Sequence, residues 1–252
     1  MKQKDAIPTP LPRVSLWPNL KERNLQPELM DDPQLDPQLH QGALQGLSRV
    51  NWVTQTHRLL WKPIQHYCQE NQLNSLSVLD LACGSGDLLV WLHSKALKQG
   101  IHLKVTGCDL SPVALEFARH RATQENIDAE FLQRDVLNEQ LPSNQDVVVC
   151  SLFLHHLESD NIVKLLQRMA ESARHLVVAQ DLIRSRWGYL MCLVGTHFIS
   201  RSPIVHVDGP LSVAGALTLS EMTLLAEQAG LAGAQLNHHW PERFVFTWQP
   251  SP

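Results

Sequence analysis

Three aspartates, Asp80, Asp109 and Asp135, each stand at or near the end of a short apolar run that is typical of a buried strand. The first run, residues 78–82, leads directly into the glycine turn at 83–86, and a helical pattern follows. Glycines in such a turn let the backbone reach positive φ and leave room for a ligand against the main chain. Carboxylates at strand ends attract cations and accept hydrogen bonds from ribose hydroxyls. The pattern therefore predicts a nucleoside site.

Two kinds of nucleoside cofactor compete for this site. A dinucleotide-binding turn has a third glycine, and Leu89 stands in its place here. Asp80 would also lie near a pyrophosphate and repel it, whereas S-adenosylmethionine (SAM) has no phosphate and carries a cationic amine and a sulfonium. The acid therefore favours SAM, and an NAD-dependent oxidoreductase is kept as the alternative.

The order D-x-A-C-G-S-G-D followed by G-C-D-L-S resembles that of the class I SAM-dependent methyltransferases. The resemblance covers residues 75–250 and implies an α/β, Rossmann-like fold. We expect a seven-stranded, mostly parallel sheet with an antiparallel C-terminal hairpin and an N-terminal helical lid. It also implies SAM as the cofactor and S-adenosylhomocysteine (SAH) as the product.

The resemblance assigns cofactor contacts position by position. Leu110 would lie beside the adenine, Asp135 would accept from the adenine amino group, and the Val136 N–H would meet a ring nitrogen. In the predicted lid, an arginine and an asparagine stand among apolar neighbours and could face the SAM carboxylate; an exposed arginine and a capping asparagine are the alternative. The expected cofactor-binding set is Asp80, Ala82, Cys83, Gly84, Gly86, Asp109, Leu110, Asp135, Val136, Ser151, Arg49 and Asn51.

Two adjacent histidines, His155 and His156, follow the predicted fourth strand at 145–151. Neutral imidazole is available near pH 7 and could deprotonate a phenol or hold an acceptor. The alternative is that one of the two is structural. The Asn/Asp-Pro-Pro-aromatic motif of enzymes that methylate DNA bases or glutamine is missing here, which disfavours those substrates.

The stretch 184–217 departs from strand–helix alternation and is where enzymes of this kind build the acceptor pocket. We expect His155 or His206 to be catalytic. His206 could pair with Asp208 as a base and its orienting acid, or residues 208–210 could form a turn. The expected substrate-pocket residues are His156, Trp187, Tyr189, Phe198 and Arg201, with Ile199 as a further apolar wall.

Three segments precede or make up the predicted domain. Residues 1–27 contain five prolines and should form an extended arm, which Leu16 and Trp17 could pin to the body. Residues 28–74 form the helical lid, with one helix over 37–64 and a further one over 64–71. Residues 75–252 form the methyltransferase domain.

Composition excludes several classes of protein. A net charge of −4 with no cluster of Lys and Arg offers no footprint for nucleic acid. The five cysteines are widely spaced, without the C-x-x-C pairs of metal sites, so we expect no metal and a reduced, cytoplasmic compartment. The longest apolar segment, 187–199, is too short to span a bilayer, which predicts no stable membrane insertion.

The sequence thus predicts transfer of a methyl group from SAM to a small aromatic or phenolic acceptor, at oxygen or carbon. The pattern looks like that of the ubiquinone and menaquinone biosynthesis methyltransferases. A non-catalytic SAM-binding module is a second alternative. The acceptor's identity and the oligomeric state are not specified by these motifs.

Overall fold

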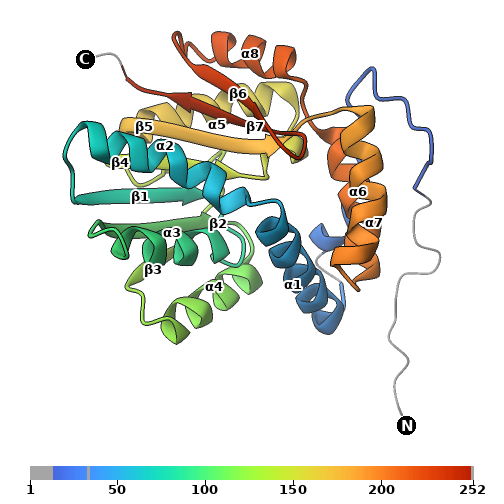
Figure 1. The fold of residues 1–252 in the computed structure, drawn as a ribbon, viewed down its shortest axis with the longest axis horizontal. Helices are drawn as coiled ribbons and strands as arrows, with labels where there is room; N and C mark the ends of the chain where they lie inside the picture. Colours follow the sequence, from blue (N-terminus) through green and yellow to red (C-terminus); the bar gives the residue numbers. More distant parts are fainter. Residues whose placement is uncertain (1–13, 33–34, 251–252) are drawn as a thin grey trace.

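Seven strands form one sheet in the order β3-β2-β1-β4-β5-β7-β6 (Figure 1). The computed structural model describes residues 14–32 and 35–250. Neighbouring strands from β3 to β5 are parallel, while β7 is antiparallel to both β5 and β6. This confirms the mostly parallel sheet and the antiparallel C-terminal hairpin. The strands are β1 Ser75–Leu81, β2 His102–Asp109, β3 Ala129–Gln133, β4 Gln145–Ser151, β5 Ala173–Leu182, β6 Gln235–His239 and β7 Arg243–Trp248.

The central strands are apolar on both faces because each face is covered by helices. In β1, Leu76 and Val78 join one core while Leu79 and Leu81 join the other. On the first face lie α2 (Thr56–Glu70), α3 (Asp87–Leu97) and α4 (Pro112–Gln124), and on the second lie α5 (Ser159–Ser172) and α8 (Leu219–Gln228) (Figure 1). The side chains of one strand therefore pack into two cores, one on each face of the sheet.

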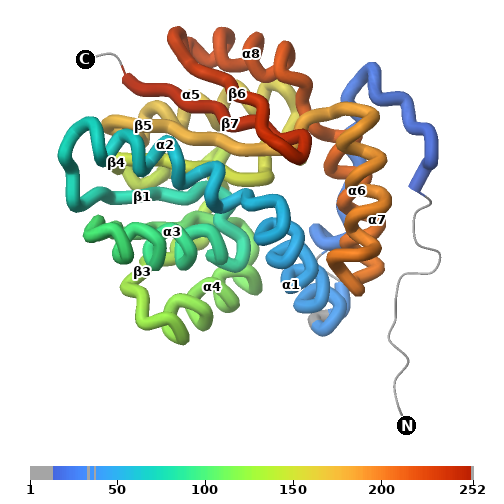
Figure 2. The backbone as a smooth tube through the Cα atoms, in the orientation of Figure 1, coloured from blue at the N-terminus to red at the C-terminus, as the bar shows by residue number. Residues whose placement is uncertain are grey.

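Three helices stand to one side of the sheet, near the carboxyl ends of its parallel strands (Figure 2). They are α1 (Pro37–Val53), α6 (Arg186–Ile199) and α7 (Pro203–Gly215). A small separate core joins α1 to α7 through Ala43, Ile204 and Val205. The predicted lid and the predicted insert are thus packed against each other, although they are far apart in the sequence.

The boundaries of the lid helices differ from the prediction. The break falls between α1 and α2, where Gln55 has a φ of +54°, and α2 then runs on past Ile64 with Pro63 inside it. Apolar periodicity continues through both helices, so it could not locate this break. The turn considered at 208–210 is also wrong, because these residues lie within α7.

The end of the predicted arm lies along α6 and α7. The Arg23 guanidinium donates from Nε to Gly215 O at 2.8 Å, and the Tyr189 hydroxyl donates to Ser15 O at 2.7 Å. Leu16 and Trp17 are 70% and 91% exposed, so they do not pin the arm as expected. Backbone acceptors attach it instead, and residues 1–13 lie outside the described part.

Two further observations concern the cysteines and the lengths of the helices. All five cysteines are free thiols. Within residues 14–32 and 35–250, no helix is both long and apolar enough to cross a bilayer.

Gly86 offers a test of the packing behind the glycine turn. It has a φ of +70°, and a Cβ there would lie 2.9 Å from Ala118 Cβ. We expect Gly86→Ala to lower the free energy of unfolding by roughly 2–4 kcal/mol, from left-handed strain plus overpacking. Gly100 has a φ of +73° with open space around it, so Gly100→Ala should cost only about 1–2 kcal/mol. Equal losses in urea unfolding would contradict the packing argument.

Candidate active site

The carboxyl ends of β1 and β4 open onto a cavity of about 720 Å³. Its floor includes Asp80 and Gly84 after β1 and Ser151 at the end of β4. The remaining wall comes from the segment before α1, from α1 and α2, from α6 and α7, and from the start of β7. Open α/β sheets place ligands at this edge, so the cavity is the candidate active site.

The backbone turns sharply at both strand ends that form the floor. Ala82 and Leu152, which are not glycines, have φ values of +57° and +53°, and both line the cavity. Such conformations cost free energy and concentrate at functional sites. Gly84, with a φ of +52°, donates its N–H to Asp109 Oδ2 at 2.8 Å. Asp109 Oδ1 accepts from Ser111 N at 2.9 Å, so this carboxylate fixes the turn to the start of α4.

Asp80 is a buried carboxylate that lacks a full set of partners. It is 1% exposed, and its Oδ1 has no hydrogen-bond donor. Burial raises the pKa of Asp80 well above its usual value, and the charges of Asp87 and Asp109 raise it further. The three acids make this end of the cavity negative, which suits a cationic ligand.

His57 and Asp87 join the lid to the helix that follows the glycine turn. His57 Nε2 lies 3.1 Å from Asp87 Oδ2, and both residues line the cavity. Burial alone would raise the pKa of Asp87, but the hydrogen bond and charge of His57 outweigh burial and lower that pKa. This pair was not predicted from the sequence, where His57 is one residue of the expected lid helix at 37–64.

The second cluster of titratable groups is built around His155. Its Nδ1 donates to Asp181 Oδ1 at 2.6 Å, and its backbone N–H donates to Asp181 Oδ2 at 3.2 Å. Its Nε2 lies 3.7 Å from Glu28 Oε1. Glu28 itself accepts from Ser212 Oγ at 2.5 Å. The imidazole is therefore oriented by one carboxylate, as a general base is, and its other nitrogen lies near a second carboxyl group.

The protonation of this cluster follows from burial and mutual charge. Burial would lower the pKa of His155, but the charge and hydrogen bond of Asp181, assisted by the charge of Glu28, raise it. Burial raises the pKa of Glu28 to about 7. Burial, then the charge of His155, lowers the pKa of His156 to about 3, so His156 is neutral. His155 thus holds a proton more firmly than an ordinary histidine.

Three side chains of this cluster could also ligate a metal ion. Ligand atoms of Glu28, His155 and His156 all lie within 4.8 Å of one another. No metal was expected from the sequence, because the cysteines lack the spacing of a metal site. Glu28 is far from the two histidines in the sequence, and only the fold brings them together. The hydrogen bond from His155 to Asp181 leaves only Nε2 of that imidazole free to act toward the cavity.

Several predicted residues do line the cavity, and others do not. Those in its wall are Asn51, Asp80, Ala82, Cys83, Gly84, Ser151, His155, His156, Trp187 and Ile199. Asn51 Oδ1 is buried without a partner, which makes it available to a ligand. Outside the wall lie Arg49, Gly86, Asp109, Leu110, Asp135, Val136, Tyr189, Phe198, Arg201 and His206.

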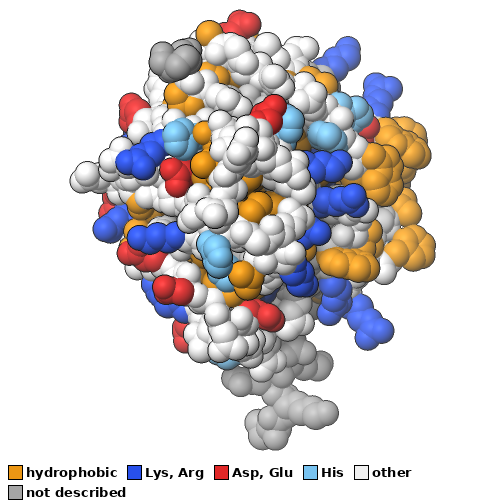
Figure 3. Space-filling model, turned by 60° about the vertical axis from the view of Figure 1, so that its left-hand side comes forward, with side chains coloured by type: hydrophobic (Ala, Val, Ile, Leu, Met, Phe, Trp, Pro, Cys, Tyr) orange, Lys and Arg blue, Asp and Glu red, His pale blue; other side chains and the backbone are white. Residues whose placement is uncertain are grey.

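The acceptor-side expectations need correction at five positions. The Tyr189 hydroxyl is bonded to the arm, Phe198 is 86% exposed, and Arg201 is exposed. Figure 3 shows exposed hydrophobic side chains gathered at one edge of the molecule beside Lys and Arg. His206 and Asp208 do not pair: His206 Nε2 lies 2.8 Å from Ser200 O, and the Asp208 carboxylate accepts from the backbone of residues 29 and 30. On a helix, residues two apart point in different directions.

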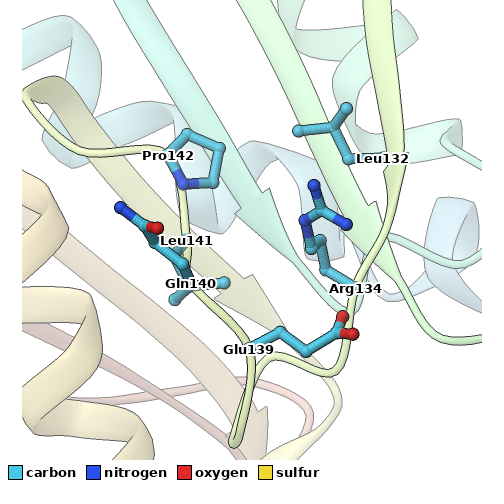
Figure 4. A pocket seen from close by; sticks show the side chains of 6 residues that line it. All are labelled: Leu132, Arg134, Glu139, Gln140, Leu141 and Pro142. Atoms are coloured by element: carbon cyan, nitrogen blue, oxygen red, sulfur yellow. The ribbon is translucent and has the colours of Figure 1, made fainter.

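The expected adenine contacts lie on the neighbouring strand ends. Asp135 follows β3, and its carboxylate accepts from Leu137 N and from Asn138 Nδ2 at 2.9 and 2.8 Å. The adenine roles of Asp135, Val136 and Leu110 stay predictions. A second, shallower pocket of about 480 Å³ adjoins this loop, lined by Leu132, Arg134, Glu139, Gln140, Leu141 and Pro142 (Figure 4).

Replacing Asp80 should change the stability of the free protein and its affinity for SAM in opposite directions. Because burial raises the pKa of Asp80 in the folded state, this residue lowers the stability of the free protein at pH values above the usual pKa of an aspartate, where it ionises more readily in the unfolded chain. Asp80→Asn should therefore raise the unfolding temperature at pH 7 without ligand, yet weaken SAM binding by roughly ten- to a hundredfold. Asp128→Asn, at an exposed acid, is the control and should change neither. Unchanged SAM affinity in calorimetry would refute a cofactor role for Asp80.

The chain was compared with known families and curated proteins. Residues 78–175 match the family model described as "Methyltransferase domain". The chain is 27% identical to the ubiquinone biosynthesis O-methyltransferase of Pseudomonas entomophila (strain L48) over 154 residues, which is 60% of this chain and 57% of that protein. It is 29% identical to the enzyme of that name from Yersinia pestis (strain Pestoides F) over 125 residues, 48% of this chain and 49% of that protein. The matched part is thus half to three fifths of these relatives.

Solved structures share the fold over most of the chain. The plantazolicin methyltransferase BpumL, in complex with a triazolic desmethylPZN analog and SAH, has a TM-score of 0.66 at 18% identity, covering 85% of this chain and 91% of that one. Magnesium protoporphyrin IX methyltransferase from Synechocystis PCC 6803, with bound SAH, has a TM-score of 0.55 at 16% identity, covering 87% and 90%.

These matches agree with the geometry of the site. The family model spans β1 to the start of β5, which includes the glycine turn, Asp80 and Asp109. The strand order and the antiparallel β7 belong to the same fold as the solved methyltransferases. The match to the methyltransferase domain, the curated relatives and the shared fold together support a class I SAM-dependent methyltransferase.

Proposed function

We propose that this protein transfers the methyl group of SAM to the hydroxyl oxygen of a small aromatic acceptor bound in the cavity. The observation that carries the proposal is the buried Asp181–His155 pair, in which His155 lines the cavity and its Nδ1, not its Nε2, is held by Asp181. The names of the curated relatives, which are O-methyltransferases, support oxygen as the receiving atom. The match to the methyltransferase domain argues against the NAD-dependent oxidoreductase.

Residues on the floor of the cavity would hold the cofactor. The unpartnered Asp80 Oδ1 and Asn51 Oδ1 fit the charged amino-acid end, and Gly84 leaves its main chain open to a ligand. Asp109 keeps lone pairs on both oxygens for ribose hydroxyls, beyond the two N–H groups that it already accepts. When bound, the sulfonium supplies an activated methyl group for in-line displacement.

His155 would accept the proton of the acceptor. As the acceptor oxygen bonds to the methyl carbon, the carbon–sulfur bond breaks, sulfur becomes a neutral thioether, and the hydroxyl proton passes to His155 Nε2. Asp181 then stabilises the imidazolium through the 2.6 Å hydrogen bond to Nδ1. Positioning in a closed cavity contributes as well, since well-oriented reactants gain roughly 7–11 kcal/mol. A ring carbon next to a phenolate would use the same base.

A panel of phenols, amines and thiols incubated with labelled SAM tests the reaction. We expect SAH release with phenols and a methyl ether as the product, which NMR separates from a C-methyl product. Absence of turnover across the panel, with SAM binding intact, would favour the non-catalytic module.

Replacing the proposed base should affect rate more than cofactor binding. His155→Asn keeps a hydrogen-bond donor for Asp181 but provides no proton acceptor, so the methylation rate should fall by about 10²–10⁴. SAM affinity by calorimetry should stay within twofold. His206→Ala tests the other predicted histidine, which lies outside the cavity wall, and should leave the rate unchanged. A normal methylation rate in His155→Asn, together with a reduced rate in His206→Ala, would show that His206 is the base.

The pH dependence of the rate should report the charge around His155. Only neutral imidazole can take the proton, so the rate should rise with pH through a midpoint above the usual histidine pKa, because Asp181 and Glu28 outweigh burial and raise the pKa of His155. Removing one negative charge with Glu28→Gln should lower the pKa of His155 and move the midpoint to lower pH. A midpoint that does not move would show that Glu28 does not act on His155.

A further inference from the structure

Arg243 is a buried cation in the wall of the cavity, and most of its donors lack an acceptor. The residue is 3% exposed. Its Nη2 donates to Thr54 Oγ1 at 3.1 Å, while Nε and Nη1 have no partner among residues 14–32 and 35–250. Burial lowers the pKa of Arg243 to about 10, so it is still charged at neutral pH. A buried charge without its hydrogen bonds costs several kcal/mol.

A second buried arginine shows how this fold satisfies a structural guanidinium. Arg184 is 4% exposed, and its two terminal nitrogens donate to the Glu221 carboxylate at 2.6 and 2.8 Å. It also donates to the carbonyls of Ala216 and Leu20 at 2.5 and 3.1 Å. Arg184 ties helix α8 to the end of β5 and lies outside the cavity wall. Arg243 has no such set of partners. Unlike Arg184, Arg243 lines the cavity.

The carboxylate that acts most on Arg243 is already engaged. Asp181 counteracts the effect of burial on the pKa of Arg243, yet its oxygens accept from His155 Nδ1 and from the backbone of residues 155 and 182. The charge of Arg243 in turn lowers the pKa of His155. The cation and the proposed base therefore share one region of the cavity.

We propose that Arg243 forms an anion subsite of the cavity, so that the acceptor carries a carboxylate or a second ionised oxygen besides its reacting hydroxyl. The proposal rests on the proposed function for the place of the reacting hydroxyl at His155. An anionic oxygen would form charge-assisted hydrogen bonds with the guanidinium and supply the missing counter-charge. A neutral acceptor would leave the buried cation as unpaired as it is in the free protein.

The first test compares the two buried arginines without any ligand. Arg243→Met removes an unsatisfied charge and should raise the unfolding temperature. The same change at the satisfied site, Arg184→Met, leaves Glu221 without its cationic partner and two carbonyls without a donor, and should lower it. If Arg243→Met destabilises the protein as much as Arg184→Met does, Arg243 is structural and the proposal is wrong.

The second test measures binding of matched ligands by calorimetry in the presence of SAH. Hydroxyaryl carboxylic acids of increasing length, beginning with 4-hydroxybenzoate, are compared with their carboxamides, which have the same shape without the charge. The wild type should bind the acid about ten- to a hundredfold more tightly in at least one pair. Arg243→Met should lose that preference, and Arg243→Lys should keep part of it. No preference in any pair, or a preference that survives in Arg243→Met, overturns the subsite.

The third measurement separates this proposal from the proposed function. Arg243→Met should move the pH–rate midpoint to higher pH, because the charge of Arg243 lowers the pKa of His155. A midpoint that stays in place would contradict the shared cavity region. Failure of the wild type to bind SAH or to release it in turnover would refute the proposed function, whatever the preference between acid and amide.

Discussion

A buried polar or charged group without its hydrogen-bond partners destabilises a folded protein, and the described part of this cavity contains two, a carboxyl group and a guanidinium. Asp80 on the floor has an oxygen with no donor, and Arg243 in the wall has two nitrogens with no acceptor. The same chain pairs Asp181 with His155 and Arg184 with Glu221, so it can satisfy buried charges. We infer that ligands complete these two groups: a cationic cofactor at Asp80 and an anionic group of the acceptor at Arg243.

The cavity depends on segments that are distant in sequence. Asp208 in α7 accepts from the backbone N–H groups of Leu29 and Met30, which holds the segment that carries Glu28 beside His155. Helix α1 packs on α7 through a small core of its own, separate from the two cores that hold the sheet. The cofactor floor is therefore part of the sheet, while the acceptor wall is formed by helices attached to its edge. Acceptor specificity can change with these helices while the floor stays the same.

Much of the cofactor floor could be predicted, because its signals are local. Asp80, Gly84 and Asp109 stand at fixed offsets from apolar runs, and parallel strands bring their carboxyl ends to one edge. The acceptor wall could not be predicted in the same way. From the sequence, Glu28 was placed only at the start of the predicted lid, and no role was assigned to Arg243. Phe198 and Arg201, chosen because they are in the insert, are exposed: Phe198 lies on the outer face of α6, and Arg201 lies in the link between α6 and α7.

By itself the sequence indicated the resemblance to the methyltransferase family, the mostly parallel sheet with its antiparallel end, and the residue types at the first strand ends, because these follow from residue type and short spacing. Only the tertiary structure decided which histidine is oriented by an acid and which charges are left unpaired. Both depend on contacts between residues far apart in the chain, such as Thr54 with Arg243 and Glu28 with His155. Burial and pairing, which set the pKa and the cost of each charge, arise only when those segments meet.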